Sequence, residues 1–228
     1  MNHIAHIETP FREKFGVPRQ AGLVDYEARV VFEPDYRVPE AVRGLEEFDY
    51  LWLLWLFDRN GTDGGWSPTV RPPRLGGNKR VGVFASRSPF RPNPIGLSSV
   101  RLLRIEEGPV LVVGGADLVD GTPIIDIKPY IEYADSHSGV RSGYAMAAPR
   151  PLEGVDDPQG CLARLGPQER HAIEATLMQD PRPHYQNDPS RVYTMAFGRH
   201  EVSFKVDGGR VEVLNIVNAD SKTIFSVS

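Results

Sequence analysis

The stretch Tyr50-Leu-Trp-Leu-Leu-Trp-Leu-Phe57 is the longest apolar run in the sequence, and an acidic residue closes it at each end, Asp49 and Asp58. Such a run is far shorter than the roughly 20 apolar residues that cross a bilayer, so we expect no membrane span. Its length and its aromatic and aliphatic side chains are typical of a buried β-strand.

Other short apolar or alternating runs lie on both sides of this stretch, separated by turns that contain glycine and proline. They cover residues 28–32, 81–85, 98–105, 109–113 and 124–127. Strands at this spacing predict a β-sandwich or a β-barrel. One short helical pattern occurs around residues 39–46, where Pro39 suits a first helical turn.

The sequence changes in character near residue 148. Residues 148–160 are polar and contain proline and glycine, as in a linker. A helix is predicted from Gly166-Pro167 to residue 179, and strands at 192–197, 202–206 and 211–217. We therefore expect a mainly β protein with a first domain of residues 1–148. A small α+β domain, residues 149–228, should be docked on the first domain, because a domain of this size buries too little apolar surface to be very stable by itself.

The composition is that of an ordinary soluble globular protein: 228 residues, 26 Lys and Arg against 30 Asp and Glu, and a net charge of -4. Cys161 is the single cysteine and the histidines are scattered, so neither a disulfide within the chain nor a metal site is expected. The N-terminus lacks the features of a secretion signal, which predicts a cytoplasmic protein. Glycine-rich nucleotide loops and a nucleophile elbow are absent from the sequence, which argues against the common nucleotide-binding folds and hydrolases.

A basic run interrupts this balanced composition between residues 71 and 104, where eight positive charges occur without one acidic residue. They are Arg71, Arg74, Lys79, Arg80, Arg87, Arg91, Arg101 and Arg104. One interpretation is a solvated surface whose acidic partners come from elsewhere in the fold. The other is a site for an anionic partner, because arginine on a frame rich in proline and glycine suits phosphate recognition.

The run Val81-Gly-Val-Phe-Ala-Ser-Arg-Ser-Pro-Phe-Arg-Pro-Asn-Pro-Ile-Gly-Leu97 resembles the signature of a known family. This is the TrmO family (also YaeB or TsaA-like) of S-adenosylmethionine-dependent tRNA methyltransferases. Further stretches agree with it in the same order, at residues 14–20, 41–46, 68–78, 117–130 and 180–185. The resemblance spans nearly the whole chain.

This resemblance implies a β-barrel methyltransferase domain followed by a small C-terminal α+β domain. It also implies a homodimer with S-adenosylmethionine bound near the subunit interface. The implied substrate is a threonine tRNA that carries threonylcarbamoyl-adenosine next to the anticodon, methylated on its exocyclic 6-amino nitrogen.

The family's cofactor contacts map by resemblance onto five places in the sequence. They are Pro18, Arg19 and Gln20; Asp58 and Arg59; Arg87; Leu97; and Asp117, Leu118, Val119, Asp120 and Gly121. Arg19 or Arg87 could hold the cofactor carboxylate in a bidentate pair, and Asp117 or Asp120 could accept from its ribose or ammonium. A plain hairpin turn is the alternative interpretation of Asp120-Gly121, and the two can hold together.

Catalytic and substrate roles are assigned to further residues as hypotheses. Asp126 could accept the proton that the amine loses, Lys128 could hold a phosphate or carboxylate, and Tyr130 could stack on a base. The alternative for residues 126–130 is a plain strand that ends in a proline turn. Arg71, Arg74 and Arg91 are expected to contact phosphates, whereas Arg101 and Arg104 should flank a strand. Arg182 and Tyr185 could contact tRNA, or the 180–185 stretch could only end a helix and form a domain hinge.

Two other functions remain open at this point. The protein could be an RNA-binding module with a vestigial cofactor pocket, or a methyltransferase that acts on another substrate. Agreement of residues 18–20 and 117–121 with the family's cofactor contacts favours an enzyme over a binding module.

Overall fold

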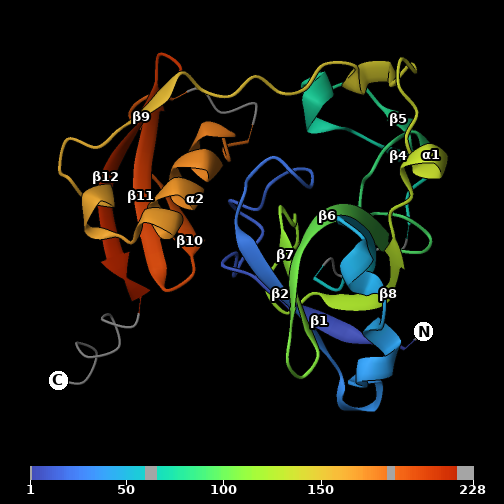
Figure 1. Ribbon diagram of the computed structural model, residues 1–228. Helices are drawn as coiled ribbons and strands as arrows, with labels where there is room; N and C mark the ends of the chain where they lie inside the picture. The colour runs from blue at the N-terminus through green and yellow to red at the C-terminus, as the bar shows by residue number, and fades with distance from the viewer. Residues whose placement is uncertain (1, 60–65, 184–187, 220–228) are drawn as a thin grey trace, which may run out of the picture.

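The computed structural model describes residues 2–59, 66–183 and 188–219 (Figure 1). A β-barrel forms one half of the molecule, and a second sheet covered by a helix forms the other half. An irregular N-terminal segment runs between the two halves. The predicted mainly β fold is confirmed.

The barrel is closed by six antiparallel strands in the order β1-β2-β7-β6-β3-β8. Their bounds are β1 Ala5–Glu8, β2 Glu27–Phe32, β3 Tyr50–Leu56, β6 Ile95–Glu106, β7 Val110–Gly114 and β8 Pro123–Pro129. The strands expected around residues 28–32, 50–57, 98–105, 109–113 and 124–127 are thus present. Closure gives each of these strands a hydrogen-bonded neighbour on both sides.

The apolar sequence of β3 is explained by the surroundings of its two faces. Leu51 and Leu53 are fully buried and Trp55 is 8% exposed, because these alternate residues point into the barrel. The residues between them are partly covered on the outer face, where Leu54 lies opposite Leu97 of β6 and Asp126 of β8. Both faces therefore favour apolar side chains.

Two predicted elements of the barrel half differ in the structure. Residues 81–85 form only the short strand β5 (Val81–Gly82), paired with β4 (Thr69–Val70), and then a 3-10 turn, η6 (Val83–Ala85). The helix expected around residues 39–46 is wrong: two 3-10 turns, η2 (Pro39–Val42) and η3 (Leu45–Glu47), occur there. Gly44 separates them at a φ of 85°, in a left-handed conformation that ends a helix.

The C-terminal half is a four-stranded sheet in the order β10-β11-β12-β9, with helix α2 on one face (Figure 1). Its bounds are β9 Gly154–Asp156, α2 Pro167–Met178, β10 Tyr193–Phe197, β11 His200–Asp207 and β12 Arg210–Asn218. The helix and the last three strands match the prediction. β9 corrects it, because part of the expected linker 148–160 pairs in parallel with β12.

The remaining elements are short turns of helix. They are η1 Pro34–Tyr36, η5 Pro73–Leu75, α1 Glu132–Asp135, η7 Gly143–Ala145 and η8 Leu162–Arg164. Among the described residues, no helix has the length and apolar character needed to span a membrane.

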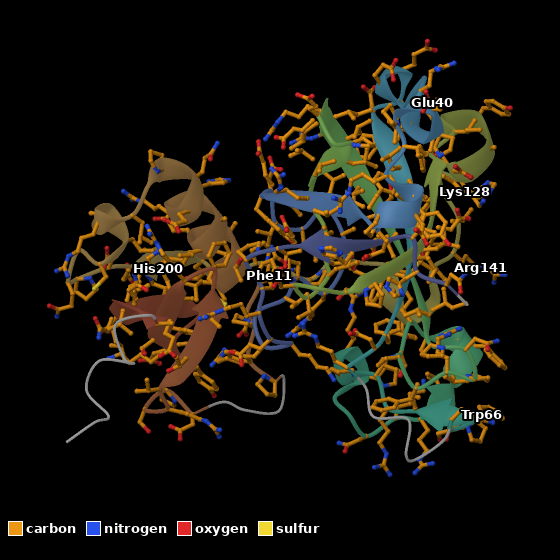
Figure 2. The ribbon with its side chains drawn as sticks, turned by 90° about the horizontal axis from the view of Figure 1, so that it is seen from below. Phe11, Glu40, Trp66, Lys128, Arg141 and His200 are labelled. Atoms are coloured by element: carbon orange, nitrogen blue, oxygen red, sulfur yellow. The ribbon has the colours of Figure 1, made fainter. Side chains whose placement is uncertain are left out.

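Barrel and C-terminal sheet share one continuous apolar core. Phe11, which lies between the two halves in Figure 2, is fully buried. Its ring makes edge contacts with Tyr26 at the barrel and with Phe197 of β10, at centroid distances of 5.0 and 5.4 Å. The C-terminal part therefore packs on the barrel through buried apolar side chains, as expected.

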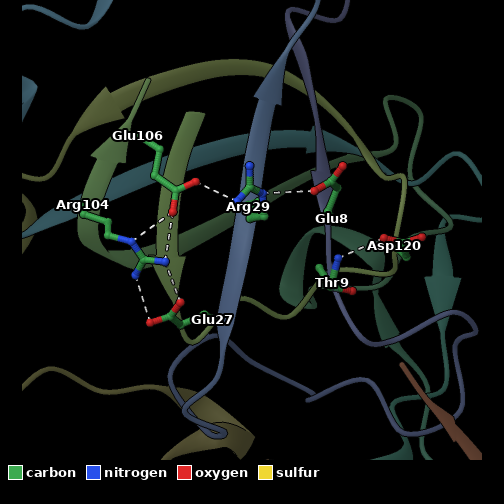
Figure 3. A network of polar contacts seen from close by, with 7 residues as sticks. All are labelled: Glu8, Thr9, Glu27, Arg29, Arg104, Glu106 and Asp120. Carbon is green, nitrogen blue, oxygen red and sulfur yellow. Dashed lines mark hydrogen bonds and ion pairs between the residues drawn. The ribbon is translucent and has the colours of Figure 1, made fainter. Parts of the chain in front are cut away.

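Arg101 and Arg104, which were expected to flank a strand, lie within β6. The guanidinium of Arg104 donates to both carboxylate oxygens of Glu27 and to Glu106, and Arg101 pairs with Asp25 (Figure 3 shows the Arg104 network). For these two arginines, acidic partners do come from elsewhere in the fold. The other arginines of the basic run lie in a different environment.

Candidate functional site

A cavity of about 600 Å³ opens where strands β3 and β6 meet two loops, residues 18–21 and 86–91. Six of the expected cofactor residues line it: Pro18, Arg19, Gln20, Arg87, Leu97 and Asp117. Arg87 Nη1 donates a hydrogen bond to Gln20 Oε1, which ties one loop to the other. Residues far apart in the sequence thus form one site of a size that suits a small cofactor.

A chain of hydrogen bonds reaches the carboxylate of Asp117 in this cavity. Trp55 Nε1 donates to Ser98 Oγ at 3.0 Å, and Ser98 Oγ donates to Asp117 Oδ1 at 2.5 Å. Burial raises the pKa of Asp117 above its ordinary value, although the bond from Ser98 and the charge of Arg87 oppose this. The carboxylate is therefore oriented by its neighbours but poorly solvated.

Aromatic side chains of β3 and the adjoining turn form another wall of the cavity, namely Trp52, Trp55 and Phe57. Ser98 and Ser99 of β6 complete it. Sequence reasoning assigned these residues to strands and gave them no role in a site. The pair of serines at positions 98 and 99, within a strand, was the available signal.

A smaller adjoining hollow, about 200 Å³, contains Asp58, Arg59 and Val119 and shares Asp117 with the first cavity. The guanidinium of Arg59 donates to the backbone oxygens of Arg12 and Asp120. Arg59 therefore fastens the loop after β1 to the turn before β8.

Leu118, Asp120 and Gly121 do not line either space. Asp120 Oδ1 accepts from the backbone N–H of Thr9 at 2.9 Å (Figure 3), and Gly121 has a φ of 76°. These contacts are those of a structural turn, while contact of the three residues with a cofactor stays a prediction.

A second cavity, about 860 Å³, adjoins the first and shares Arg19, Ser86 and Arg87 with it. Six arginines line this cavity: Arg19, Arg71, Arg74, Arg80, Arg87 and Arg182. Among the described residues, its lining includes no acid, and its apolar part includes the exposed rings of Phe90 and Tyr144. Such a lining suits an anionic ligand that also carries a flat, stackable group.

Comparison with known families agrees with this geometry. The family model of the tRNA-methyltransferase O N-terminal domain matches residues 6–136, and that of the TrmO C-terminal domain matches residues 159–219. The chain belongs to the TrmO family.

Individual TrmO relatives are similar over most of their length. A tRNA (adenine(37)-N6)-methyltransferase of Escherichia coli is 43% identical, over 89% of this chain and 90% of the relative. A tRNA (adenine(37)-N6)-methyltransferase of Eikenella corrodens is 50% identical, over 71% of this chain and 93% of the relative. A crystal structure of TrmO from Pseudomonas aeruginosa superposes with a TM-score of 0.77 at 31% identity, covering 95% of this chain and 97% of that one.

Two of the residues expected to contact tRNA, Arg91 and Tyr185, are not placed at the second cavity. Arg91 Nη1 donates to the backbone oxygens of Val83 and Ser86, at 3.2 and 2.7 Å, so it holds its own loop together. It lines the first cavity rather than the second. Tyr185 lies outside the described residues.

The three expected catalytic residues do not line the cavities. Lys128 Nζ lies 2.8 Å from Asp126 Oδ2, and the ring of Tyr130 packs near Tyr50 and Trp52. The strand register places Lys128 opposite Trp52, which does line the first cavity. Lys128 itself lies on the side of the barrel away from the C-terminal sheet (Figure 2). Their catalytic roles stay predictions.

Proposed function

We propose that this TrmO protein transfers a methyl group from S-adenosylmethionine to the exocyclic 6-amino nitrogen of an adenosine in tRNA. The observation that supports this most directly is the junction of two chemically different cavities at Arg19 and Arg87. The first has the carboxylate of Asp117 beside its arginines, and the second has six arginines and no acid among its described lining residues. A methyl donor and an anionic acceptor could therefore lie side by side.

The first cavity fits S-adenosylmethionine by the chemistry of its lining. The cofactor carries two cationic groups, an adenine, a ribose diol and a carboxylate. Asp117 can accept from its ammonium or ribose, Arg87 can pair with its carboxylate, and Trp52 and Phe57 offer rings to the adenine or the sulfonium. When bound, the cofactor supplies an electrophilic methyl group.

The second cavity fits a nucleotide that is displaced from its helix or loop. Arg71 and Arg74 can pair with phosphate oxygens, while Phe90 and Tyr144 can stack on a base. Arg182 comes to the same space from the C-terminal half, and its guanidinium is oriented there by an ion pair with Asp180 at 2.8 Å. The named relatives act on adenine 37 of tRNA, and we propose the same position here.

We further propose that the substrate is the threonylcarbamoyl-adenosine of a threonine tRNA. The carboxylate of its threonyl group adds a negative charge close to the reacting nitrogen. Arg19 borders both cavities, where such a charge would lie. Bidentate pairing of arginine with carboxylate would both bind and orient this group.

Orientation is the main contribution to catalysis in this proposal. The nitrogen forms a bond to the methyl carbon as the carbon–sulfur bond breaks, and the amine then loses a proton. Holding nitrogen and methyl carbon in line supplies several kcal/mol without an acid or base. The chain's residues therefore bind and align the two molecules, and the proton can pass to water or, by hypothesis, to Asp126.

Nucleoside mass spectrometry tests the proposed function. Threonine tRNA purified from a strain that lacks the methyltransferase is incubated with the protein and S-adenosylmethionine. We expect threonylcarbamoyl-adenosine to gain one methyl group. Binding of tRNA without any methylated nucleoside would favour an RNA-binding module, and methylation of a different acceptor would favour another substrate.

Arg71 and Arg87 should have separable roles. Changing Arg71 to Ala should weaken tRNA binding and lower the salt dependence by roughly 0.7–0.9 in logarithmic slope, because one phosphate contact is lost. Changing Arg87 to Ala should mainly weaken cofactor binding. Filter binding across a salt series and cofactor titration measure both effects.

Arg104→Ala is the matched control for this experiment, because Arg104 belongs to the same basic run but pairs with Glu27 and Glu106 on the barrel surface. Its tRNA salt slope should equal that of the unchanged protein. An equal loss of slope in Arg71→Ala and Arg104→Ala would show that the second cavity has no special role in binding phosphate.

We also propose a homodimer, cofactor binding without a metal, and action in the cytoplasm, where tRNA is found. Tyr50, Ile131 and Tyr133 are exposed near the ends of β3 and β8, and Tyr133 is 90% exposed. Within residues 2–59, 66–183 and 188–219, no cluster of potential metal ligands occurs. Light scattering tests the dimer, and calorimetry with a chelator present tests metal-free binding.

A further inference from the structure

The bridging segment, residues 10–19, runs between barrel and C-terminal sheet without forming a helix or strand. Its last residues, Pro18 and Arg19, line the cofactor cavity, and Gln20 follows directly. A segment without its own ladder of hydrogen bonds takes its position from the surfaces around it. Those surfaces therefore decide where this wall of the cavity lies.

Aromatic contacts attach the middle of the bridging segment to the C-terminal sheet. The ring of Phe15 stacks near Tyr193 of β10 and Phe204 of β11, at centroid distances of 6.3 and 6.4 Å. These two residues are neighbours across the β10–β11 pair and belong to the buried side of the sheet. Phe15 thus covers an apolar surface that would otherwise face solvent.

The backbone of the segment touches the same sheet at Gly16. A Cβ atom at this position would lie 2.5 Å from both Cγ and Sδ of Met195, which is fully buried in β10. Gly16 also has a φ of 96°, which side chains other than glycine rarely allow. The close approach fixes the backbone three residues before Arg19.

Polar contacts join the two ends of the segment to the C-terminal half. The backbone N–H of Gly198 donates to Pro10 O at 2.6 Å, and that of Ala196 donates to Glu13 Oε1 at 3.3 Å. At the other end, Arg19 Nη2 donates to the backbone oxygens of Asp180 and Arg182, at 2.9 and 3.1 Å. A residue of the cavity wall is thereby bonded directly to the turn after α2.

We infer that the C-terminal domain positions the cofactor cavity, acting through Phe15, Gly16 and Arg19 on the wall formed by residues 18–20. Phe15 is a positioning residue in this scheme, because it contacts neither cavity. The inference rests on the proposed function, since it treats the first cavity as the cofactor site. It assigns to a domain outside the barrel a part in binding S-adenosylmethionine.

Phe15→Ala tests the inference by removing the ring that stacks on Tyr193 and Phe204. We expect the Kd for S-adenosylmethionine to rise about tenfold, within the usual range of coupling between distant sites. The KM for the cofactor should rise similarly, while kcat at saturating cofactor should change little. Phe15→Leu, which keeps an apolar side chain, should restore most of the affinity and covers the case in which Phe15→Ala does not fold.

Val211→Ala is the matched control. Val211 is fully buried in β12, two strands away from β10, so this change weakens the C-terminal core without touching the bridging segment. The Kd of Val211→Ala for S-adenosylmethionine should stay within about twofold of that of the unchanged protein. This should hold even if the melting temperature of Val211→Ala falls by as much as that of Phe15→Ala. Equal losses of affinity in the two variants would overturn the inference, as would normal affinity in Phe15→Ala.

Coupling must also act in the reverse direction, because binding linkage is reciprocal. S-Adenosylmethionine should therefore slow hydrogen exchange at the amides of Ala196 and Gly198, which bond to the bridging segment. Unchanged exchange at both amides in a protein that binds the cofactor would contradict the inference alone. If the protein without any substitution does not bind S-adenosylmethionine, the proposed function and the inference are both overturned.

Discussion

Replacing Asp117 by asparagine is expected to weaken S-adenosylmethionine binding about 10- to 100-fold and yet raise the melting temperature of the free protein. A hydrogen bond between the carboxylate and a charged partner is worth about 1.5–3 kcal/mol, which corresponds to this loss of affinity. The free protein, in contrast, carries a poorly solvated charge whose removal is favourable. Relief of about 1 kcal/mol would raise the melting temperature by about 2–4 °C in a chain of this size.

The direction of the pH dependence follows from the raised pKa of Asp117. In the pH window between 3.8, the ordinary pKa of the carboxyl, and the raised pKa of Asp117 in the folded protein, the native protein binds more protons than the unfolded chain. Stability from this group is therefore greatest below that window and falls as the pH rises through it. Cofactor affinity should change in the opposite sense, since binding needs the ionised carboxylate. Asp117→Asn should lack both dependences.

Asp25→Asn provides the matched control for Asp117→Asn. The Asp25 carboxylate pairs with Arg101 on the barrel surface and lines neither cavity, so this change neutralises a barrel carboxylate away from the cofactor site. Cofactor affinity of this variant should be unchanged in calorimetry, and its melting temperature should not rise. A similar loss of affinity in the two variants would mean that general electrostatics, rather than a direct contact of Asp117, governs binding.

Strand positions could be predicted from the sequence because their side-chain pattern reports their surroundings. The apolar run 50–57 reflects a strand with one face inside the barrel and the other partly covered. The pattern around residues 39–46 was misleading, since Gly44 adopts a left-handed conformation that divides it into two turns. β9 was missed because it is only three residues long and forms the edge of its sheet.

The candidate site was only partly predictable, for a related reason. Arg19, Arg87 and Asp117 belong to unusual loop sequences that the resemblance singled out, and the structure brings them to one cavity. Trp55 and Ser98 could not be assigned in this way, because they look like ordinary strand residues and meet only across the β3–β6 pair. Their contribution depends on strand register, which no single stretch of sequence contains.

The basic run shows that charge alone does not separate structure from function. Arg101 and Arg104 have acidic partners at the start of β2 and within β6, whereas Arg71 and Arg74 lie in a cavity whose described lining residues include no acid. The first interpretation of the run therefore holds for Arg101 and Arg104, and the second stays a proposal for Arg71 and Arg74. Only the three-dimensional position of each guanidinium distinguishes them.

Gly96→Ala is expected to abolish cofactor binding and to lower the melting temperature by about 5–10 °C. Gly96 lies opposite Trp55 in the β3–β6 pair, and a Cβ atom there would come within 2.2–2.5 Å of three ring atoms of the indole. The buried ring must then move, which breaks the bond from Trp55 Nε1 to Ser98 Oγ and disturbs the group that orients Asp117. Overpacking costs about 1–3 kcal/mol and a lost buried hydrogen bond about 1 kcal/mol, which together account for the expected shift.

Two comparisons separate this steric cause from a general effect of adding a methyl group to a glycine. Gly82→Ala is the control, because nothing lies within 4 Å of its Cβ position and its φ is -59°, so calorimetry and thermal melting should show little change. In a Trp55→Ala background, the added cost of Gly96→Ala should largely disappear, because the two changes remove one shared contact. Persistence of the full cost without the indole would place the strain in the backbone of β6, and Gly96 would then act on the cavity by a route other than Trp55.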